Sequence, residues 1–176
     1  MAKRMTVSSY FRLPESNKPM ELVYGFVHEP ASPFCSHQSV VGKLFRVLTR
    51  HVERYRLGVV HVSPLDVVLD KKSALVVQPD VLFVAKERLD IVRDRVWGSP
   101  DLTIEVLSPG TTRRDRSSKL EWYRRYGVTE CWLVNMKRAS VEVIDLKTNE
   151  RRSFQARQRI RSTVLPRLAT RVDRVF

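Results

Sequence analysis

The sequence predicts an α/β domain in which a mixed central β-sheet is flanked by two main helices. Three observations lead to this prediction. Apolar residues recur at helical spacing over 36–55, short apolar runs of strand-like composition follow, and a second helical segment separates two of those runs. Strands that alternate with helical segments are typical of a sheet covered by helices. The 176 residues fit one domain, 1–176.

The N-terminal part predicts a leader, a strand and a loop. We expect residues 1–19 to form a polar leader. Residues 20–28 alternate around Leu22 and Val27, which favours a first strand. Two prolines then indicate a loop over 29–36.

The clearest helix is predicted over 36–55. Ser36 is a plausible N-cap, because its hydroxyl can accept a hydrogen bond from the first helical turn, and Gly58 follows the end of the segment. One apolar stripe at helical spacing predicts the buried face. Its members are Val40, Val41, Leu44, Leu48, Val52 and Tyr55.

The remaining chain predicts further strands and one more helix. Strands are expected at 59–62, 66–69, 76–84, 102–107, 130–135 and 140–146. Thr112 and Asp115 have the spacing of a capping box, so a helix should begin there and end at Tyr126, with Gly127 at its C′ position. The final apolar segment, 163–176, is expected to pack back on the sheet.

The chain is strongly basic, with 32 Lys and Arg against 19 Asp and Glu and a formal net charge of +13. A small domain of this charge favours a polyanionic partner, of which nucleic acid is the usual one. A solvated basic surface remains the alternative. Arginines gather after position 150, at 151, 152, 157, 159, 161, 167, 171 and 174, and again at 113, 114, 116, 124 and 125.

The cysteines and the hydropathy of the chain indicate the cellular compartment in which the protein is expected. Cys35 and Cys131 lie far apart without metal-ligand spacing, which favours free thiols in a reducing cytoplasm. The N-terminus lacks the apolar core of a signal peptide, and no apolar run approaches the roughly 20 residues that span a bilayer. We therefore expect a cytoplasmic protein without a membrane partner.

Two carboxylates and a lysine form the most informative constellation. Glu105 stands in the middle of an apolar strand, where a carboxylate is costly unless it is paired, hydrogen-bonded or bound to a metal. Asp80 begins another apolar run, and it meets Glu105 if the two strands are neighbours. Two carboxylates with waters suit Mg²⁺, and Lys119 on the next helix can stabilise charge that develops on a phosphate. Asp101 lies roughly 13 Å along the strand from Glu105, too far to share a metal.

Each of these residues also has a structural interpretation. Glu105 can be satisfied by a buried arginine, Lys119 can be a solvated helix residue, and Asp80 can belong to a turn after Pro79. Each structural interpretation is as reasonable as the functional one for a single residue. Their order and spacing together favour a site.

At these residues the chain resembles the Uma2 family, a branch of the PD-(D/E)XK nuclease superfamily. The resemblance covers nearly the whole chain. It is carried by Pro79-Asp80-Val81, the run from Pro100 to Pro109 with Glu105-Val106-Leu107-Ser108, Arg114-Asp115, Lys119-Leu120, Tyr123, Gly127-Val128, and Glu130-Cys131-Trp132-Leu133-Val134. Glu21-Leu22 with Gly25, Ser36-His37-Gln38, and Val164-Leu165-Pro166 with Leu168 extend it to both ends.

The resemblance implies a restriction-endonuclease-like fold and a phosphodiesterase that depends on Mg²⁺ or Mn²⁺. It assigns Asp80 and Glu105 as metal ligands. The superfamily lysine two residues after the acid is here Leu107, which is apolar, and Lys119 takes its place from the next helix. Glu21 is the additional acid that the resemblance suggests, although an exposed strand residue is the alternative.

Other residues complete the predicted site. His37 is expected at a helix N-terminus, where protonation is disfavoured, and it either contacts a phosphate or makes a local hydrogen bond. Arg113, Arg114 and Arg116 stand beside the site in sequence and are expected to hold the nucleic-acid backbone without reading its sequence.

The leading hypothesis is a Mg²⁺-dependent endonuclease acting on nucleic acid, with DNA as the expected substrate. The alternatives are a catalytically inactive nucleic-acid-binding protein with the same fold, and a structural protein whose basic tail contacts an acidic partner. An enzyme that cuts both strands often works as a pair, so a homodimer is expected.

Overall fold

The computed structural model describes residues 4–14, 19–30, 32–108 and 113–176, with only the backbone described at 113–115. In chain order the elements are α1 (Val7–Tyr10), β1 (Glu21–Val23), β2 (Phe26–His28), α2 (Cys35–Tyr55), β3 (Gly58–Val62), β4 (Val67–Asp70), β5 (Leu75–Val77), β6 (Val81–Ala85), η1 (Lys86–Ile91), β7 (Val96–Trp97), β8 (Leu102–Leu107), α3 (Arg113–Tyr126), β9 (Glu130–Asn135), β10 (Ser140–Asp145), β11 (Arg151–Gln155) and η2 (Val172–Arg174). The predicted α/β class is confirmed.

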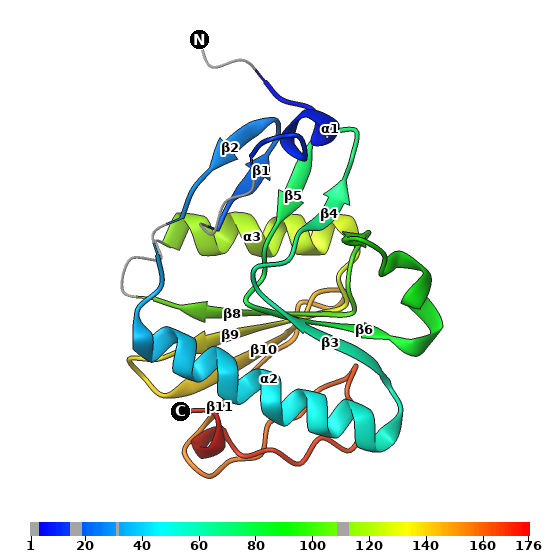
Figure 1. Cartoon of the computed structure of the whole chain (residues 1–176). Helices are drawn as coiled ribbons and strands as arrows, with labels where there is room; N and C mark the ends of the chain where they lie inside the picture. The colour runs from blue at the N-terminus through cyan, green and yellow to red at the C-terminus, as the bar shows by residue number, and fades with distance from the viewer. Residues whose placement is uncertain (1–3, 15–18, 31, 109–112) are drawn as a thin grey trace.

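The strands form two mixed sheets rather than one central sheet. The upper sheet in Figure 1 has the order β2-β1-β5-β4-β7, and the lower sheet has the order β11-β10-β9-β8-β6-β3. Helix α3 lies between the two sheets, and α2 covers the other face of the lower sheet (Figure 1). Within the lower sheet β8 and β9 are parallel, and α3 connects them.

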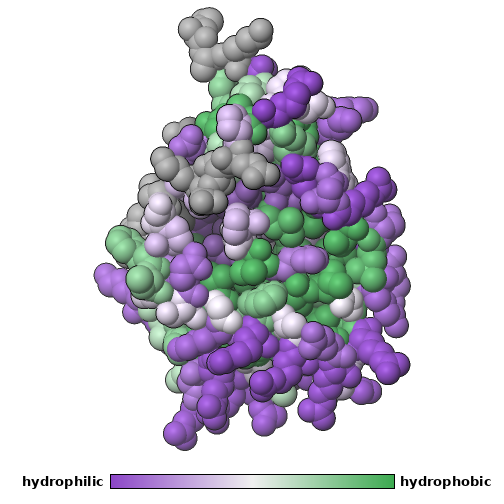
Figure 2. Space-filling model, viewed as in Figure 1, coloured by the Kyte–Doolittle hydropathy of each residue, from purple (hydrophilic) through white to green (hydrophobic). Residues whose placement is uncertain are grey.

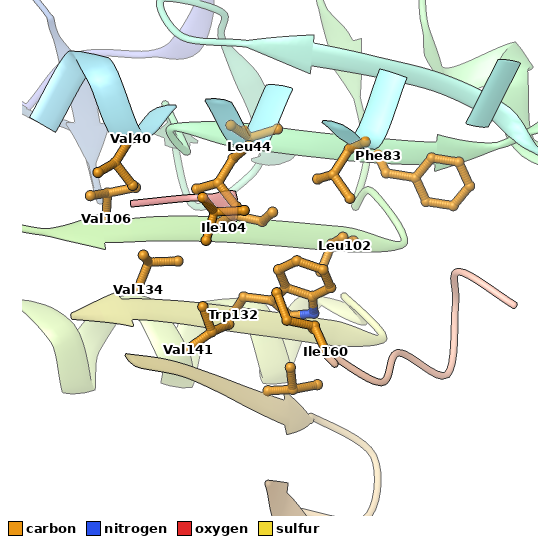
Figure 3. Close-up of a cluster of buried hydrophobic side chains, with 14 of the residues drawn as sticks. Val40, Leu44, Phe83, Leu102, Ile104, Val106, Trp132, Val134, Val141 and Ile160 are labelled. Atoms are coloured by element: carbon orange, nitrogen blue, oxygen red, sulfur yellow. The ribbon is translucent and has the colours of Figure 1, made fainter. Parts of the chain in front are cut away.

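Strand β8 divides its side chains between the two faces of the lower sheet. Leu102, Ile104 and Val106 pack in one cluster with the buried side of α2. Figure 3 shows Val40 and Leu44 of α2 facing this strand. Because successive side chains point to opposite faces, Glu105 faces α3 and the upper sheet.

Helix α2 forms as the apolar spacing predicts. Five members of the predicted stripe, from Val40 to Val52, are buried, whereas Tyr55 is 36% exposed. The predicted N-cap is wrong. The helix begins at Cys35 after Phe34, which has extended backbone angles and makes no side-chain cap. The next chain reversal uses Arg56 in the left-handed region before Gly58 starts β3.

The predicted strand over 76–84 is two strands in different sheets, β5 above and β6 below. Pro79 has no N–H for a ladder hydrogen bond, and the backbone N–H of Gln78 donates to the side chain of Glu21 at 2.9 Å. The chain therefore leaves one sheet and enters the other within three residues.

The N-terminal predictions also need correction. The expected strand over 20–28 is a hairpin, because Tyr24 and Gly25 turn the chain with positive φ angles of 50° and 88°. The expected polar leader contains α1, in which Val7 and Tyr10 are buried. The Tyr10 hydroxyl donates to the carbonyl oxygen of Met20 at 2.8 Å, which fastens α1 beside β1.

The C-terminal segment packs on the lower sheet as predicted. Leu165, Val172 and Val175 are buried in the same cluster as α2. Strand β11, which the sequence did not predict, pairs antiparallel with β10 at the edge of the sheet. Helix α3 ends as predicted at Gly127, which has a φ of 89°.

Glu130 anchors this segment to the start of β9. Its carboxylate is fully buried and accepts hydrogen bonds from Trp132 Nε1 at 2.7 Å and Ser162 Oγ at 2.6 Å. Thr163 donates to it through both its backbone N–H and its hydroxyl, each at 2.7 Å. No helix in the described ranges has the length and apolar character needed to cross a membrane.

Candidate active site

Asp80 and Glu105 meet because β6 and β8 are neighbours in the lower sheet. The antiparallel register pairs Val81 with Ile104, so the residue before β6 lies next to the residue after Ile104. The backbone N–H of Val106 donates to Asp80 Oδ2 at 2.7 Å. The arrangement that would let the two carboxylates converge is therefore present.

Lys119 lies between two carboxylates from different sheets. Its Nζ is 3.1 Å from Glu105 Oε2 and 2.9 Å from Glu21 Oε1. Lys119 and Glu105 come from α3 and β8, whereas Glu21 comes from β1. The alternative interpretations of an arginine partner for Glu105 and an exposed strand position for Glu21 are wrong, because Glu21 is 4% exposed and both acids contact the same ammonium group.

Tyr123 also contacts Glu105, and it was not among the predicted site residues. Its hydroxyl donates to Glu105 Oε1. Tyr123 is fully buried and stands four residues after Lys119, on the same face of α3. This spacing in the sequence could have indicated that Tyr123 lies beside Lys119 in the site.

His37 joins the cluster from α2. Its Nε2 is 3.4 Å from Asp80 Oδ2. The expectation of disfavoured protonation is wrong. The hydrogen bond to Asp80 raises the pKa of His37, the charge of Asp80 and the backbone of Val106 add to the rise, and together they outweigh the effect of burial. His37 Nδ1 is buried without a hydrogen-bond partner among the described residues.

Burial and the neighbouring charges shift the pKa values of Glu105 and Lys119. Burial raises the pKa of Glu105 to about 7, and the charges of Asp80 and Glu21 contribute to the rise, while Lys119 opposes it. Burial alone would lower the pKa of Lys119, but Glu105 and Glu21 outweigh it and the pKa is raised. The ammonium group therefore stays charged and is shared between Glu105 and Glu21.

The residues present suit a hard cation. Across the described ranges, no three His, Cys, Asp or Glu side chains stand as a ready-made metal site. Mg²⁺, however, is commonly held by one or two carboxylates together with waters and substrate phosphates. Asp80 and Glu105 supply two such carboxylates from neighbouring strands.

The sequence also places Asp101 and the arginines at the start of α3 near the predicted site. Asp101 lies away from the cluster, where it accepts from Arg88 Nη1 at 2.9 Å and from the backbone N–H of Ala85 at 2.8 Å. Arg116 is half-buried on α3, one turn before Lys119. The side chains of Arg113 and Arg114 lie outside the described residues.

Comparisons with known proteins identify the family and the fold. The Uma2 family model, described as "Putative restriction endonuclease", matches residues 7–173. A solved structure described as "a putative nuclease belonging to DUF820 from Anabaena variabilis ATCC 29413" superposes with a TM-score of 0.83 at 18% identity. The match covers 98% of this chain and 97% of that one, and at this identity it shows a shared fold. No curated protein matches.

Proposed function

Because the chain belongs to the Uma2 family, we propose that it is an endonuclease that uses Mg²⁺ or Mn²⁺ to hydrolyse phosphodiester bonds in DNA. One observation carries the proposal. Asp80 and Glu105 lie side by side on paired strands, and Lys119 Nζ is 3.1 Å from Glu105 Oε2. Paired carboxylates beside a lysine are suited to a cation and a phosphate group together.

In this proposal Asp80 and Glu105 hold the cation. When bound, the cation supplies positive charge against the phosphate and lowers the pKa of a coordinated water. Lys119 places its ammonium group beside the same carboxylates, where it stabilises negative charge on the phosphate oxygens. Without the cation, Lys119 serves as the counter-charge of Glu105 and Glu21.

Glu21 and His37 act as positioning residues. Glu21 Oε1 accepts from the Gln78 backbone and lies 2.9 Å from Lys119 Nζ, so it directs the ammonium group toward Glu105. His37 contacts Asp80 Oδ2, which also accepts from Val106, and so fixes the orientation of that carboxylate. Arg113, Arg114 and Arg116 remain proposed backbone contacts, since they stand in the first turns of α3, the helix that carries Lys119.

A nucleic-acid-binding protein without catalysis is the second candidate. It is favoured by the position of Lys119, whose ammonium group already lies between Glu21 and Glu105. A protein that only binds nucleic acid would keep this pairing permanently. A nuclease would exchange part of it for a metal ion.

Metal-dependent cleavage separates the two candidates. Supercoiled plasmid, linear duplex DNA and RNA would be incubated with the protein in Mg²⁺, Mn²⁺ or EDTA. We expect cleavage of DNA that needs the metal and falls at least about 100-fold in Glu105→Gln and in Asp80→Asn. Glu142→Gln, which changes a carboxylate 33% exposed on β10, is the matched control and should retain activity.

Lys119→Ala tests the role of the lysine. Because its charge is proposed to act on the reacting phosphate, the variant should slow single-turnover cleavage more than it weakens DNA binding. Equal rates in wild type and Glu105→Gln would refute the site. The expected homodimer would be checked by light scattering, with and without a DNA duplex.

A further inference from the structure

A groove lined with arginines lies between the C-terminal half of α2 and the chain that follows β11. Its volume is about 670 Å³. We call it the arginine groove, defined by Arg46, Arg50, Arg54, Arg167, Arg171 and Arg174. In Figure 2, hydrophilic side chains cover the lower part of the molecule, where α2 and the C-terminal segment lie in Figure 1.

The arginines of α2 form a like-charged row. Arg46, Arg50 and Arg54 are exposed and recur every four residues, so they share one face of the helix. Like charges at this spacing repel one another and destabilise the helix. The sequence therefore keeps an unfavourable row of charge on this face, which a bound anion would relieve.

Few acids neutralise the groove. Arg171 pairs with Asp173 at 2.9 Å, and this pair is partly exposed. Among the described residues, Arg46, Arg50, Arg54, Arg167 and Arg174 have no ion-pair partner. Their guanidinium groups are therefore available for phosphate, which arginine binds with two parallel hydrogen bonds.

Aromatic contacts hold the two walls together. Tyr55, at the end of α2, has the guanidinium of Arg54 at 5.6 Å and that of Arg167 at 5.9 Å from its ring centroid. His51 stacks beside Tyr55 at a centroid distance of 4.8 Å and contacts the Pro166 carbonyl oxygen at 3.0 Å. These contacts join α2 to the C-terminal segment, so part of the cationic array is fixed before a ligand arrives.

We propose that the arginine groove binds the phosphodiester backbone of the nucleic acid that the acidic cluster cleaves, at a position away from the bond that is cut. This inference rests on the proposed nuclease function. A row of arginines that extends along a helix matches a linear polyanion, whereas a single phosphate would engage only two or three of them. Such contacts position nucleic acid without reading its sequence.

The distance along α2 between the two sites indicates how far from the reacting bond the groove would contact the nucleic acid. Arg46 and Arg54 follow His37 by nine and seventeen residues on one helix. A rise of about 1.5 Å per residue places them about 14 and 26 Å along the axis from His37, which contacts Asp80 of the acidic cluster. With a rise of about 3.4 Å per nucleotide, the groove meets phosphates about four to eight nucleotides from the reacting one.

The test measures binding of the full chain to a fluorescein-labelled 30-base-pair duplex in EDTA by anisotropy, over a range of salt. The groove variant is Arg46→Gln/Arg50→Gln/Arg54→Gln. We expect its affinity to fall at least 10-fold and the slope of log K against log salt to decrease by about 2.7, since each phosphate contact contributes about 0.9. Circular dichroism and melting would confirm that the variant is folded.

A charge-matched control separates a binding surface from net charge. Lys86→Gln/Arg93→Gln/Lys147→Gln also removes three positive charges, from exposed positions outside the groove. We expect less than a 3-fold change in its affinity. Equal losses in the two triple variants, or none in the groove variant, would overturn the proposal. Tighter binding of polyglutamate or of anionic lipid vesicles than of DNA would also overturn it, by assigning the groove to another polyanion.

The same variants keep this inference separable from the proposed catalysis. If wild type binds DNA through the groove but never cleaves it, the nuclease proposal fails and the groove stands. If Glu105→Gln abolishes cleavage while the groove variant binds and cleaves like wild type, the groove fails and the nuclease proposal stands.

Discussion

Glu130→Gln should destabilise the protein far more than its small change in size suggests. Oε1 of this buried carboxylate accepts from the indole N–H of Trp132 and the hydroxyl of Ser162. Oε2 accepts from the backbone N–H and the hydroxyl of Thr163. Glutamine keeps one acceptor oxygen and replaces the other with an NH₂ group, which only donates.

The magnitude follows from which donors can adapt. The hydroxyls of Ser162 and Thr163 can rotate and accept from the new NH₂ group. The indole N–H of Trp132 and the backbone N–H of Thr163 cannot, and they lie on opposite oxygens of Glu130. Whichever way the amide turns, one donor faces another. A buried unsatisfied donor costs about 1–3 kcal/mol, and the loss of charge-assisted hydrogen bonds adds to it, so we expect a loss of about 2–4 kcal/mol.

Urea denaturation and thermal melting measure this loss. For a chain of this size 1 kcal/mol corresponds to about 2–4 °C, so the melting temperature should fall by roughly 4–16 °C. Glu142→Gln is the control, because its 3.5 Å pair with Arg151 is partly exposed and should contribute under about 1 kcal/mol. A Glu130→Gln variant within about 0.5 kcal/mol of wild type would refute the hydrogen-bond argument.

Three further predictions concern the fold and the site. Gly58→Ala would place a Cβ 2.0 Å from a backbone oxygen of β6, at a residue whose φ is +148°, so the free energy of unfolding measured in urea should fall by more than about 2 kcal/mol. Gly42→Ala is the control: its Cβ would meet nothing within 4 Å, and the free energy of unfolding should rise by about 0.5–1 kcal/mol. Burial lowers the pKa of His61, so the folded state favours the neutral ring and loses stability as pH falls through 6.5 toward the folded pKa. Between pH 7.5 and 5.5, the free energy of unfolding should therefore fall less in His61→Gln than in wild type. Tyr123→Phe removes the donor to Glu105 and should slow single-turnover cleavage with a stability loss of about 1 kcal/mol, and an unchanged rate would contradict a role in placing that carboxylate.

The fold was most predictable where a local pattern determines structure. The stripe from Val40 to Val52 predicted α2 to within one residue at its start, because helical spacing and burial coincide there. Pro79 within 76–84 indicates a break in the predicted strand, but its apolar residues do not indicate that the two parts join different sheets. Strand β11 was missed because Arg151–Gln155 lacks an apolar pattern and is held by its pairing with β10.

The candidate site was predictable in part for the same reason. The order of Asp80, Glu105 and Lys119 along the chain indicated a cluster, and the pairing of β6 with β8 brings the two acids together. The contact between Lys119 and Glu21 joins α3 to β1, two segments that lie almost a hundred residues apart in the sequence. No periodicity within either segment specifies such a contact. The roles of these residues and the single domain over 1–176 stay predictions.

The short crossing from β5 to β6 limits how the length of this protein can vary. Gln78 and Asp80 both belong to the crossing: the Gln78 backbone N–H donates to Glu21, and the Asp80 carboxylate accepts from the backbone N–H of Val106. Surface connections generally accept inserted residues, and the turn between β10 and β11 at 146–150 should do so as well. One residue added beside Pro79 would instead break either the contact of Asp80 with Val106 or that of Gln78 with Glu21. An alignment of active relatives should therefore show no insertions or deletions at 78–80, even where the neighbouring sequence diverges widely.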